Sequence, residues 1–257
     1  MCRLFGFRSV IHSQVHQSLV AADNALEQQS LQHPDGWGVS YYLAGAPHII
    51  KSAETALNDS LFQKVSGVVS SQTVLAHVRK ATLGENNILN THPFQFGNWT
   101  FAHNGNIKNF EQHRDEVLKR IPPELRRFIL GHTDSEVFFY FLLGHLQRKV
   151  SLQEKNQSLD LMADVLRDAL EEFIHIVGEY SPIDNAGEQE TYLTFLLTNG
   201  STMIAHQGGK HLHYSTYKNH CKDRDICPSF SKECEAPTKS GFVNHLIFSS
   251  EPLLGDN

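Results

Sequence analysis

CRLFGFRSV, residues 2–10, follows the start methionine directly and predicts a β-strand at the beginning of the chain. Further outward, residues 14–32 predict a helix, because apolar residues recur there at steps of three or four positions. The positions that set this spacing are Val15, Leu19, Ala22 and Leu26. Residues 33–38, HPDGWG, then break the pattern as a turn. Beyond this turn the sequence predicts strands over 39–43, 47–53, 72–78 and 99–103, and a short helix over 58–66.

Helices are predicted in the middle of the chain. The first covers residues 110–120, and Pro122-Pro123 end it because proline lacks a backbone donor and disfavours helix in the preceding residue. The second is strongly apolar and runs from Thr133 to about Gln147. Thr133 is predicted to cap it, with Glu136 completing a capping box. The third is amphipathic and covers about 158–176.

The last third of the sequence predicts β-structure. Residues 192–197 and 203–206 flank Thr198-Asn199-Gly200-Ser201, and Asn-Gly between two apolar runs is typical of a hairpin. Further strands are predicted over 211–217 and 245–249, whereas the polar residues 218–241 predict a loop. This order of strands, helices and strands predicts an α+β fold of sheets covered by helices. We expect one domain over residues 1–257.

The composition of the 257 residues limits the function classes. Hydrophobic residues make up 40% and charged residues 19%, which is typical of a soluble globular protein with a substantial core. The 22 Lys and Arg against 28 Asp and Glu give a net charge of −6 (22 − 28), which argues against a nucleic-acid partner. The longest apolar run, residues 137–143, is too short to span a membrane, and the first residues lack the features of a signal peptide. We therefore expect a cytoplasmic protein with no membrane partner.

Cys2 is the first residue that can carry chemistry. Removal of Met1, which we expect because a small residue follows it, would leave a cysteine with a free α-amine. Reference pKa values are about 7.7–8.0 for such an amine and about 8.5 for a thiol, so one residue would hold a nucleophile beside a general base. The alternative is a buried structural cysteine at the start of a strand, because free cysteines are often core residues.

Other polar residues in the first half suggest ligand contacts. Arg79 ends a predicted strand, and its planar guanidinium can bind a carboxylate with two hydrogen bonds; an ordinary surface Arg-Lys pair is the alternative. The amide of Asn104 and the backbone N–H of Gly105 can together hold an oxyanion, or form a simple turn. Asp134 can bind a substrate ammonium group, or serve only as a first-turn acid favoured by the helix dipole.

Several short motifs occur in a recognisable order over residues 2–136. They are Cys2-Arg3-Leu4-Phe5-Gly6, Asp35-Gly36-Trp37-Gly38, His77-Val78-Arg79-Lys80-Ala81-Thr82, Asn90-Thr91-His92-Pro93-Phe94, His103-Asn104-Gly105 and Thr133-Asp134-Ser135-Glu136. Taken together, these motifs resemble those of the class II glutamine amidotransferases, which are N-terminal-nucleophile hydrolases. A later segment, Ser249-Ser250-Glu251-Pro252-Leu253, looks like one in stand-alone members of the family, which include γ-glutamyl amide hydrolases of thiol metabolism.

The resemblance implies a fold and a role for each matching residue. The implied fold is a four-layer αββα sandwich. Arg79, assisted by Thr82, would bind the α-carboxylate of glutamine. Asp134, together with the backbone of Gly105, would bind the α-ammonium group. Asn104 and Gly105 would form the oxyanion hole.

The resemblance also implies the reaction. Cys2 would attack the γ-amide of glutamine or of a γ-glutamyl small molecule, with its α-amine as the general base, and water would hydrolyse the resulting thioester. No cofactor and no metal are implied. Because the sequence leaves no room for a large acceptor domain, we expect a free-standing hydrolase or a subunit that passes ammonia to a separate synthase subunit.

Alternative interpretations remain open at this point. A zinc site would use ligands within residues 211–234, but the cysteine spacings there include no close pair. The candidate ligands are His211, His213, His220, Cys221, Cys227 and Cys234. A non-catalytic module or regulatory subunit that binds γ-glutamyl ligands is a second alternative. An amidase for γ-glutamyl peptides is a third, with residues 35–38 lining the pocket beyond the amide and Trp37 either there or in the core.

Overall fold

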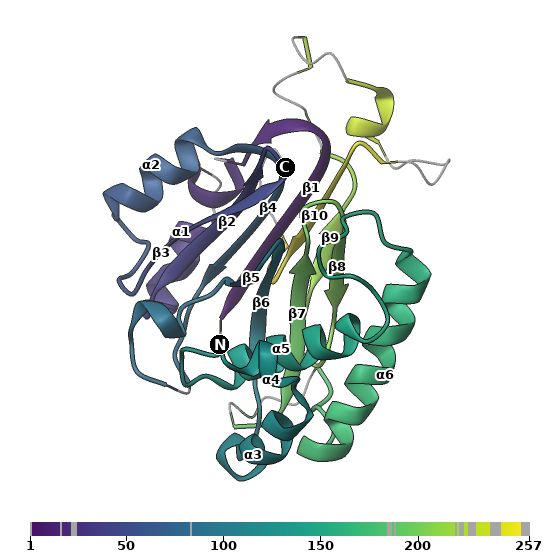
Figure 1. Cartoon of the computed structure of the whole chain (residues 1–257). Helices are drawn as coiled ribbons and strands as arrows, with labels where there is room; N and C mark the ends of the chain where they lie inside the picture. The colour runs from purple at the N-terminus through teal and green to yellow at the C-terminus, as the bar shows by residue number, and fades with distance from the viewer. Residues whose placement is uncertain are drawn as a thin grey trace.

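The computed structural model describes residues 2–15, 17–21, 25–82, 84–183, 187, 189–218, 220, 224–225, 230–236 and 243–252. Two antiparallel sheets lie face to face and are covered by helices on both outer sides (Figure 1). The larger sheet has six strands in the order β3-β2-β4-β1-β10-β9. Its strands are β1 (Arg3–Gln14), β2 (Trp37–Leu43), β3 (Ala46–Ser52), β4 (Ser70–Val78), β9 (His213–Ser215) and β10 (His245–Ser249).

The smaller sheet has four strands in the order β5-β6-β7-β8. Its strands are β5 (Phe94–Phe96), β6 (Trp99–Asn106), β7 (Tyr192–Thr198) and β8 (Met203–His206). The hairpin predicted around Asn199-Gly200 is confirmed, because Thr198 of β7 pairs with Met203 of β8 and Gly200 has a φ of +89°. The two sheets thus take strands from both ends of the chain.

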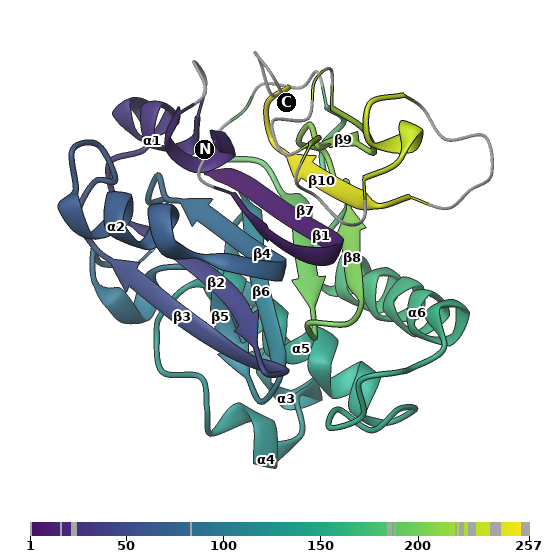
Figure 2. The ribbon, with the colours of Figure 1, turned by 90° about the horizontal axis from the view of Figure 1, so that it is seen from above.

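The helices form the two outer layers (Figure 2). The outer face of the six-stranded sheet packs against a π-helical turn (Gln17–Ala21), α1 (Leu26–Gln29), a 3-10 turn (Ser30–Gln32) and α2 (Ser60–Val68). The four-stranded sheet packs against α3 (Phe110–Arg120), α5 (Asp134–Gln147) and α6 (Leu159–Val177), with α4 (Pro123–Arg126) beside α5. The predicted α+β, four-layer αββα architecture is therefore confirmed.

The central strand β1 shows how side chains are divided between the layers. Phe5 and Phe7 join the core beneath α1 and α2, whereas Leu4 joins the small apolar layer between the sheets. Alternation along a strand sends successive side chains to opposite faces, which produces this division. Gly6 also faces the second sheet: a Cβ there would lie 2.8 Å from Leu196 Cδ1. The absence of a side chain at Gly6 therefore lets the two sheets approach closely.

Helix α5 lies between the four-stranded sheet and the neighbouring helices, and nearly all of its residues are buried. Its cap is confirmed in part, because Thr133 Oγ1 accepts a hydrogen bond from Glu136 N at 3.2 Å. The reciprocal bond of a capping box is replaced by a different one. The Glu136 carboxylate accepts from Leu130 N and Gly131 N at 3.1 and 2.7 Å, and so holds the loop before the helix.

Other predictions need correction. The continuous helix over residues 14–32 is wrong: β1 extends to residue 14, and only short helical turns follow. The apolar spacing there nevertheless marks buried positions, because Val15, Leu19 and Leu26 pack on the six-stranded sheet. Ala22 lies outside the described residues. Strand β5 and helix α4 were not predicted, and the strand over 211–217 shortens to β9. Within the predicted loop 218–241, residues 232–234 form a 3-10 turn.

Candidate active site

Cys2 lies directly before β1, and its side chain is buried at 7% exposure. Strand β1 pairs with β4 so that Arg3 faces Val78, which brings the residues after β4 beside Cys2. Cys2 Sγ accepts a hydrogen bond from Lys80 N at 3.4 Å and donates to Lys80 O at 3.5 Å. The backbone after β4 therefore fixes the thiol.

The electrostatic surroundings of the thiol come from distant parts of the sequence. Burial raises the pKa of the Cys2 thiol, because the charged thiolate loses solvation. The Lys80 backbone N–H and the Arg79 guanidinium act in the opposite direction, and the Asp134 carboxylate adds to the increase. Since both charged side chains influence this thiol, the structure brings three predicted site residues together.

Arg79 is itself buried, at 3% exposure, and holds the loop that follows it. Its Nη1 donates to Glu85 O at 3.3 Å and to Asn86 Oδ1 at 3.1 Å, and its Nη2 lies 3.4 Å from Gly84 O. Burial lowers the pKa of Arg79, whereas the nearby Cys2, Asp35 and Asp134 groups oppose that shift. The guanidinium therefore lies among acidic groups and carbonyl oxygens.

The turn at residues 35–38 is tied to the segment around Arg79. Asp35 N donates to Arg79 O at 3.0 Å, and the Asp35 carboxylate accepts from Ala81 N at 2.8 Å. Trp37 is fully buried, and its indole donates to Asp59 Oδ2 at 2.8 Å. Trp37 is thus a core residue and does not line a pocket. Thr82, by contrast, is exposed, so its side chain is less confined than that of Arg79.

The end of β6 carries Asn104 and Gly105. Leu193, the partner of Gly105 on β7, donates its N–H to Gly208 O at 2.7 Å. Gly105 and Leu193 are therefore a pair without mutual hydrogen bonds, and the Gly105 N–H points away from β7. On that side β5 pairs only with residues 99–101. A Cβ on Gly105 would lie 2.0 Å from Tyr192 O, so this position requires glycine.

Asp134 connects the end of β6 to the start of α5. Its Oδ2 accepts from Ile107 N at 2.8 Å, and its Oδ1 accepts from Ser135 N at 2.7 Å. The hydroxyl of Ser135 in turn lies 2.9 Å from His103 Nδ1. The carboxylate is buried at the helix N-terminus, where the helix dipole favours negative charge. Its position is therefore fixed by both elements.

Ser250, in the segment 249–253, makes contacts that its sequence pattern did not predict. Ser250 Oγ accepts from Leu4 N at 2.8 Å and from Asn104 Nδ2 at 3.3 Å, and Ser250 N donates to Leu4 O at 3.0 Å. Glu251 forms an ion pair of 2.7 Å with Arg3. This segment therefore holds the strand that carries Cys2 and orients Asn104; Leu253 lies outside the described residues.

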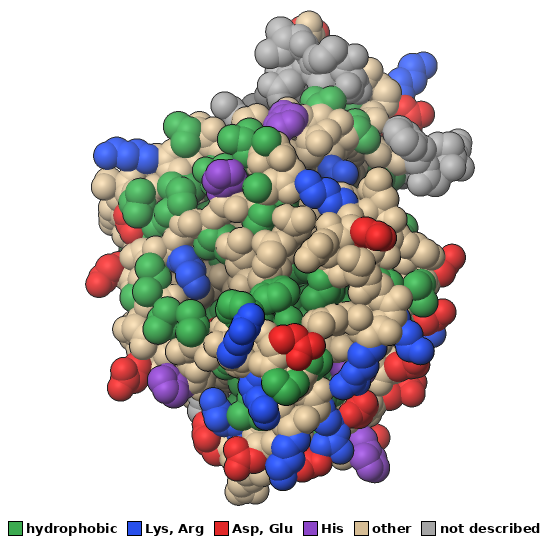
Figure 3. Space-filling model, in the orientation of Figure 1, with side chains coloured by type: hydrophobic (Ala, Val, Ile, Leu, Met, Phe, Trp, Pro, Cys, Tyr) green, Lys and Arg blue, Asp and Glu red, His purple; other side chains and the backbone are tan. Residues whose placement is uncertain are grey.

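The loop after β4, which Arg79 holds in place, also borders an apolar groove of about 840 Å³. Ile88 and Leu89 from this loop line the groove together with Phe128, Leu130 and residues of β3, β5 and α5. In Figure 3 charged side chains gather on the lower part of the face shown, over α3, α4 and α6, and hydrophobic side chains are exposed above them. The loop after β4 therefore borders both the candidate active site and the apolar groove.

No group of three or more His, Cys, Asp or Glu side chains that could hold a metal occurs among the residues that the structure describes. Cys221 and Cys227 of the hypothetical zinc site lie outside them. Of the other candidates, Cys234 is buried and its Sγ accepts from Asn244 Nδ2 at 3.2 Å.

In the same described part of the chain, no helix combines the length and apolar character needed to cross a membrane.

The fold agrees with what comparison with known proteins finds. The family model of the class-II glutamine amidotransferases matches residues 1–243. The chain belongs to this family.

Several individual members of this family are similar to the chain in sequence. A probable glutamine amidotransferase, DUG3, of Saccharomyces cerevisiae is 31% identical over 202 residues, which cover 75% of this chain and 56% of the relative. A putative glutamine amidotransferase of Haemophilus influenzae is 31% identical over 221 residues, 82% of this chain and 66% of the relative. A γ-glutamyl-hercynylcysteine sulfoxide hydrolase of Mycobacterium tuberculosis is 36% identical over 80 residues, 31% and 34% of the two chains. The first two matches span between half and two thirds of the relatives' length.

Solved structures share the fold at low sequence identity. A glutamine aminotransferase class-II domain protein from Silicibacter pomeroyi superposes with a TM-score of 0.59 at 19% identity, covering 97% of this chain and 88% of that one. Glutamine phosphoribosylpyrophosphate amidotransferase from B. subtilis gives a TM-score of 0.55 at 17% identity, covering 97% of this chain and 42% of that one. The αββα sandwich is therefore shared with amidotransferase domains.

Proposed function

We propose that this chain is a glutamine amidotransferase or amidohydrolase that cleaves a γ-glutamyl C–N bond with Cys2 as its N-terminal nucleophile. Removal of Met1 would free the α-amine of Cys2. This amine takes the thiol proton, and the thiolate attacks the γ-amide carbonyl carbon. The negative charge that forms on the oxygen is stabilised by the Asn104 amide and the Gly105 N–H.

The α-ammonium of Cys2 then gives its proton to the leaving nitrogen. The C–N bond breaks, ammonia or an amine departs, and a γ-glutamyl thioester remains on Cys2. Water attacks this thioester while the α-amine takes a proton from it, and glutamate leaves as the thiol is restored. One group thus serves first as base and then as acid, which lets a buried thiol react although burial opposes its ionisation.

The substrate's amino-acid end would bind between two opposite charges. Arg79, assisted by Thr82, takes the α-carboxylate, because a guanidinium can bind both carboxylate oxygens. Asp134, together with the carbonyl of Gly105, takes the α-ammonium group. The position of both side chains supports this assignment, because Arg79 and Asp134 are buried and both act electrostatically on the Cys2 thiol.

The observation that carries the proposal is that separate segments meet beside Cys2. Its Sγ is bonded to the backbone of Lys80, next to Arg79. Ser250 Oγ bonds both to Leu4 N, two residues after Cys2, and to Asn104 Nδ2. Intact mass spectrometry with a diazoketone analogue of glutamine tests the proposal. We expect loss of Met1, one adduct, protection by excess glutamine, and no adduct in Cys2→Ala. Retained Met1 without an adduct would contradict the mechanism and favour a non-catalytic γ-glutamyl-binding module.

The leaving group separates two forms of this function. The relative named as a γ-glutamyl-hercynylcysteine sulfoxide hydrolase supports a γ-glutamyl amide other than glutamine as a candidate substrate. Release of ammonia from glutamine and of amine from γ-glutamyl amides should be compared with the isolated protein. Rapid ammonia release without any partner supports a free-standing enzyme, whereas release only with a second protein present supports a separate synthase subunit.

A further inference from the structure

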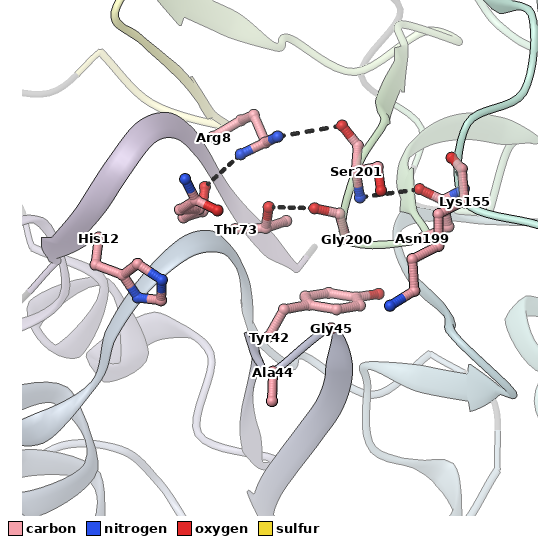
Figure 4. A pocket seen from close by; sticks show the side chains of 11 residues that line it. Arg8, His12, Tyr42, Ala44, Gly45, Thr73, Lys155, Asn199, Gly200 and Ser201 are labelled. Atoms are coloured by element: carbon pink, nitrogen blue, oxygen red, sulfur yellow. Dashed lines mark hydrogen bonds between the residues drawn. The ribbon is translucent and has the colours of Figure 1, made fainter.

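A second pocket, of about 300 Å³, lies far from Cys2 at the opposite end of the strands. Figure 4 shows the side chains that line it. It is formed where the β2–β3 turn, the start of β4 and the β7–β8 turn meet β1. Arg8 and His12 of β1 line it. Because a strand advances about 3.3 Å per residue, Arg8 lies roughly 20 Å from Cys2 along β1. The pocket is therefore separate from the candidate active site.

The charge of this pocket is one-sided. Arg8, Lys155 and His12 are among its lining residues, and none of the described residues that line it is Asp or Glu. The remaining described residues that line it are uncharged. The chain as a whole carries a net charge of −6, so a cationic pocket departs from the average surface. Such a concentration of positive charge attracts anions.

The Arg8 guanidinium has no carboxylate among the partners that the structure describes. Nε donates to Ser201 O at 3.3 Å, and Nη1 donates to Ser9 O at 2.7 Å and Gln72 O at 3.4 Å. These bonds hold the side chain in place between the two sheets. The N–H groups of Nη2 take no part in them and can bind a ligand, and a guanidinium fork suits the oxygens of phosphate.

Lys155 reaches the pocket from the connection between α5 and α6. Its Nζ would lie 2.1 Å from a Cβ on Gly45, so the glycine, whose φ is +78°, leaves the space that the ammonium group uses. Within the described part of the chain, Lys155 Nζ forms no ion pair. Arg8 and Lys155 therefore bring two positive charges without carboxylate partners to one small cavity.

We propose that this pocket binds a small phosphate-bearing anion, either inorganic phosphate or a phosphomonoester. A cavity of about 300 Å³ lies at the small end of the range for ligand sites. Two cations match a doubly charged ligand better than a single carboxylate. The anion would bind beside the hydrogen bond from Arg8 Nε to Ser201 O, which links β1 of one sheet to the β7–β8 turn of the other.

Isothermal titration calorimetry with inorganic phosphate and, separately, with glycerol phosphate tests the proposal. We expect saturable binding at one site, with the tighter of the two ligands identifying the source of the phosphate group. Arg8→Gln and Lys155→Gln should each weaken that binding at least tenfold. The matched control is Arg167→Gln, which removes a cation that pairs with Asp164 on the exposed face of α6 and should leave the affinity unchanged.

Lys155 is exposed, so the Lys155→Gln variant should fold normally. It therefore tests the proposal even where the Arg8→Gln variant does not fold. Two results would overturn the proposal. One is the absence of saturable heat with both ligands, and the other is equal affinity in the wild type and Lys155→Gln. Because neither ligand contains a γ-glutamyl group, these results are independent of the proposed reaction at Cys2.

Discussion

The amide nitrogen of Asn104 lies 3.3 Å from the hydroxyl oxygen of Ser250, which also accepts a hydrogen bond from Leu4 N. Ser250 thereby uses one N–H of the Asn104 amide and leaves the other for a ligand. The strand that carries Cys2 and the side chain proposed for the oxyanion hole are therefore positioned by one hydroxyl group.

Ser250→Ala should lower kcat by about tenfold to a hundredfold with little change in KM, because small displacements of catalytic groups have effects of this size. The rate should be expressed per active site, titrated with the diazoketone analogue. Loss of folded protein alone would then leave kcat unchanged. Ser215→Ala is the control, since this neighbouring hydroxyl bonds only to Tyr217 O at 2.7 Å in the described structure.

Asn104→Ala should lower kcat by about 10²–10³, the usual effect of removing one oxyanion-hole donor. KM should change little, because the interaction strengthens only as charge develops on the carbonyl oxygen. Steady-state kinetics with glutamine or the best γ-glutamyl amide measure both constants. A loss below tenfold would count against the assignment of Asn104.

Arg79→Ala should mainly raise KM, because it removes the proposed partner of the substrate carboxylate. Arg79→Lys should not restore it, since lysine cannot form the two parallel hydrogen bonds of a guanidinium. Lysine would also lose contacts to Glu85 O and Asn86 Oδ1 that hold the following loop. An unaltered KM in both variants would exclude this role.

Gly105→Ala should prevent correct folding of the end of β6. The added methyl group would lie 2.0 Å from Tyr192 O and 2.1 Å from His103 Nε2, and backbone on β7 cannot move away freely. Gly67→Ala is the matched control: nothing lies within 4 Å of its added Cβ in α2, so alanine there should stabilise the protein by up to about 1 kcal/mol. Thermal unfolding of both variants gives the comparison.

Stability should fall as the pH drops below about 6.5. Burial lowers the pKa of His77 to about 3 and that of His33 to about 4, from 6.5 in the unfolded chain. The unfolded state therefore binds more protons between pH 6.5 and these values, and acid favours it. Each such histidine adds up to about 1.4 kcal/mol per pH unit to the slope of the unfolding free energy.

Urea unfolding between about pH 7 and about pH 5 measures this slope. His77→Leu should make the slope shallower, because the chain then lacks one buried group that gains a proton on unfolding. His175→Gln, at an exposed position on α6, should leave it unchanged. Equal slopes in the wild type and His77→Leu would show that His77 is not the source.

Local patterns predicted the elements whose ends are set by local chemistry. The ranges 110–120, 203–206 and 245–249 agree with α3, β8 and β10, and the Thr133 cap marks the start of α5. The continuous helix over 14–32 failed because the same spacing of apolar residues serves short turns laid on a sheet. The spacing of apolar residues predicts which side chains are buried, but it does not show whether they lie on one continuous helix.

The site was harder to assemble from sequence. Cys2, Arg79 and Asp134 were singled out, and their roles rest on the resemblance. The role of Ser250 was not predicted, because its contacts with Leu4 and Asn104 depend on the docking of β10 beside β1. The cationic pocket likewise combines residues as distant as Arg8 and Ser201, which only the tertiary structure brings together.

The position of β1 between β4 and β10 sets the order of events during synthesis. The ribosome makes β1 first, yet its second neighbour is missing until residue 249 has been translated, and Ser250 and Glu251 follow. Domains generally fold as units. We therefore expect the proposed removal of Met1 to be easiest before β4 and β10 dock beside β1, because Cys2 lies directly before that strand.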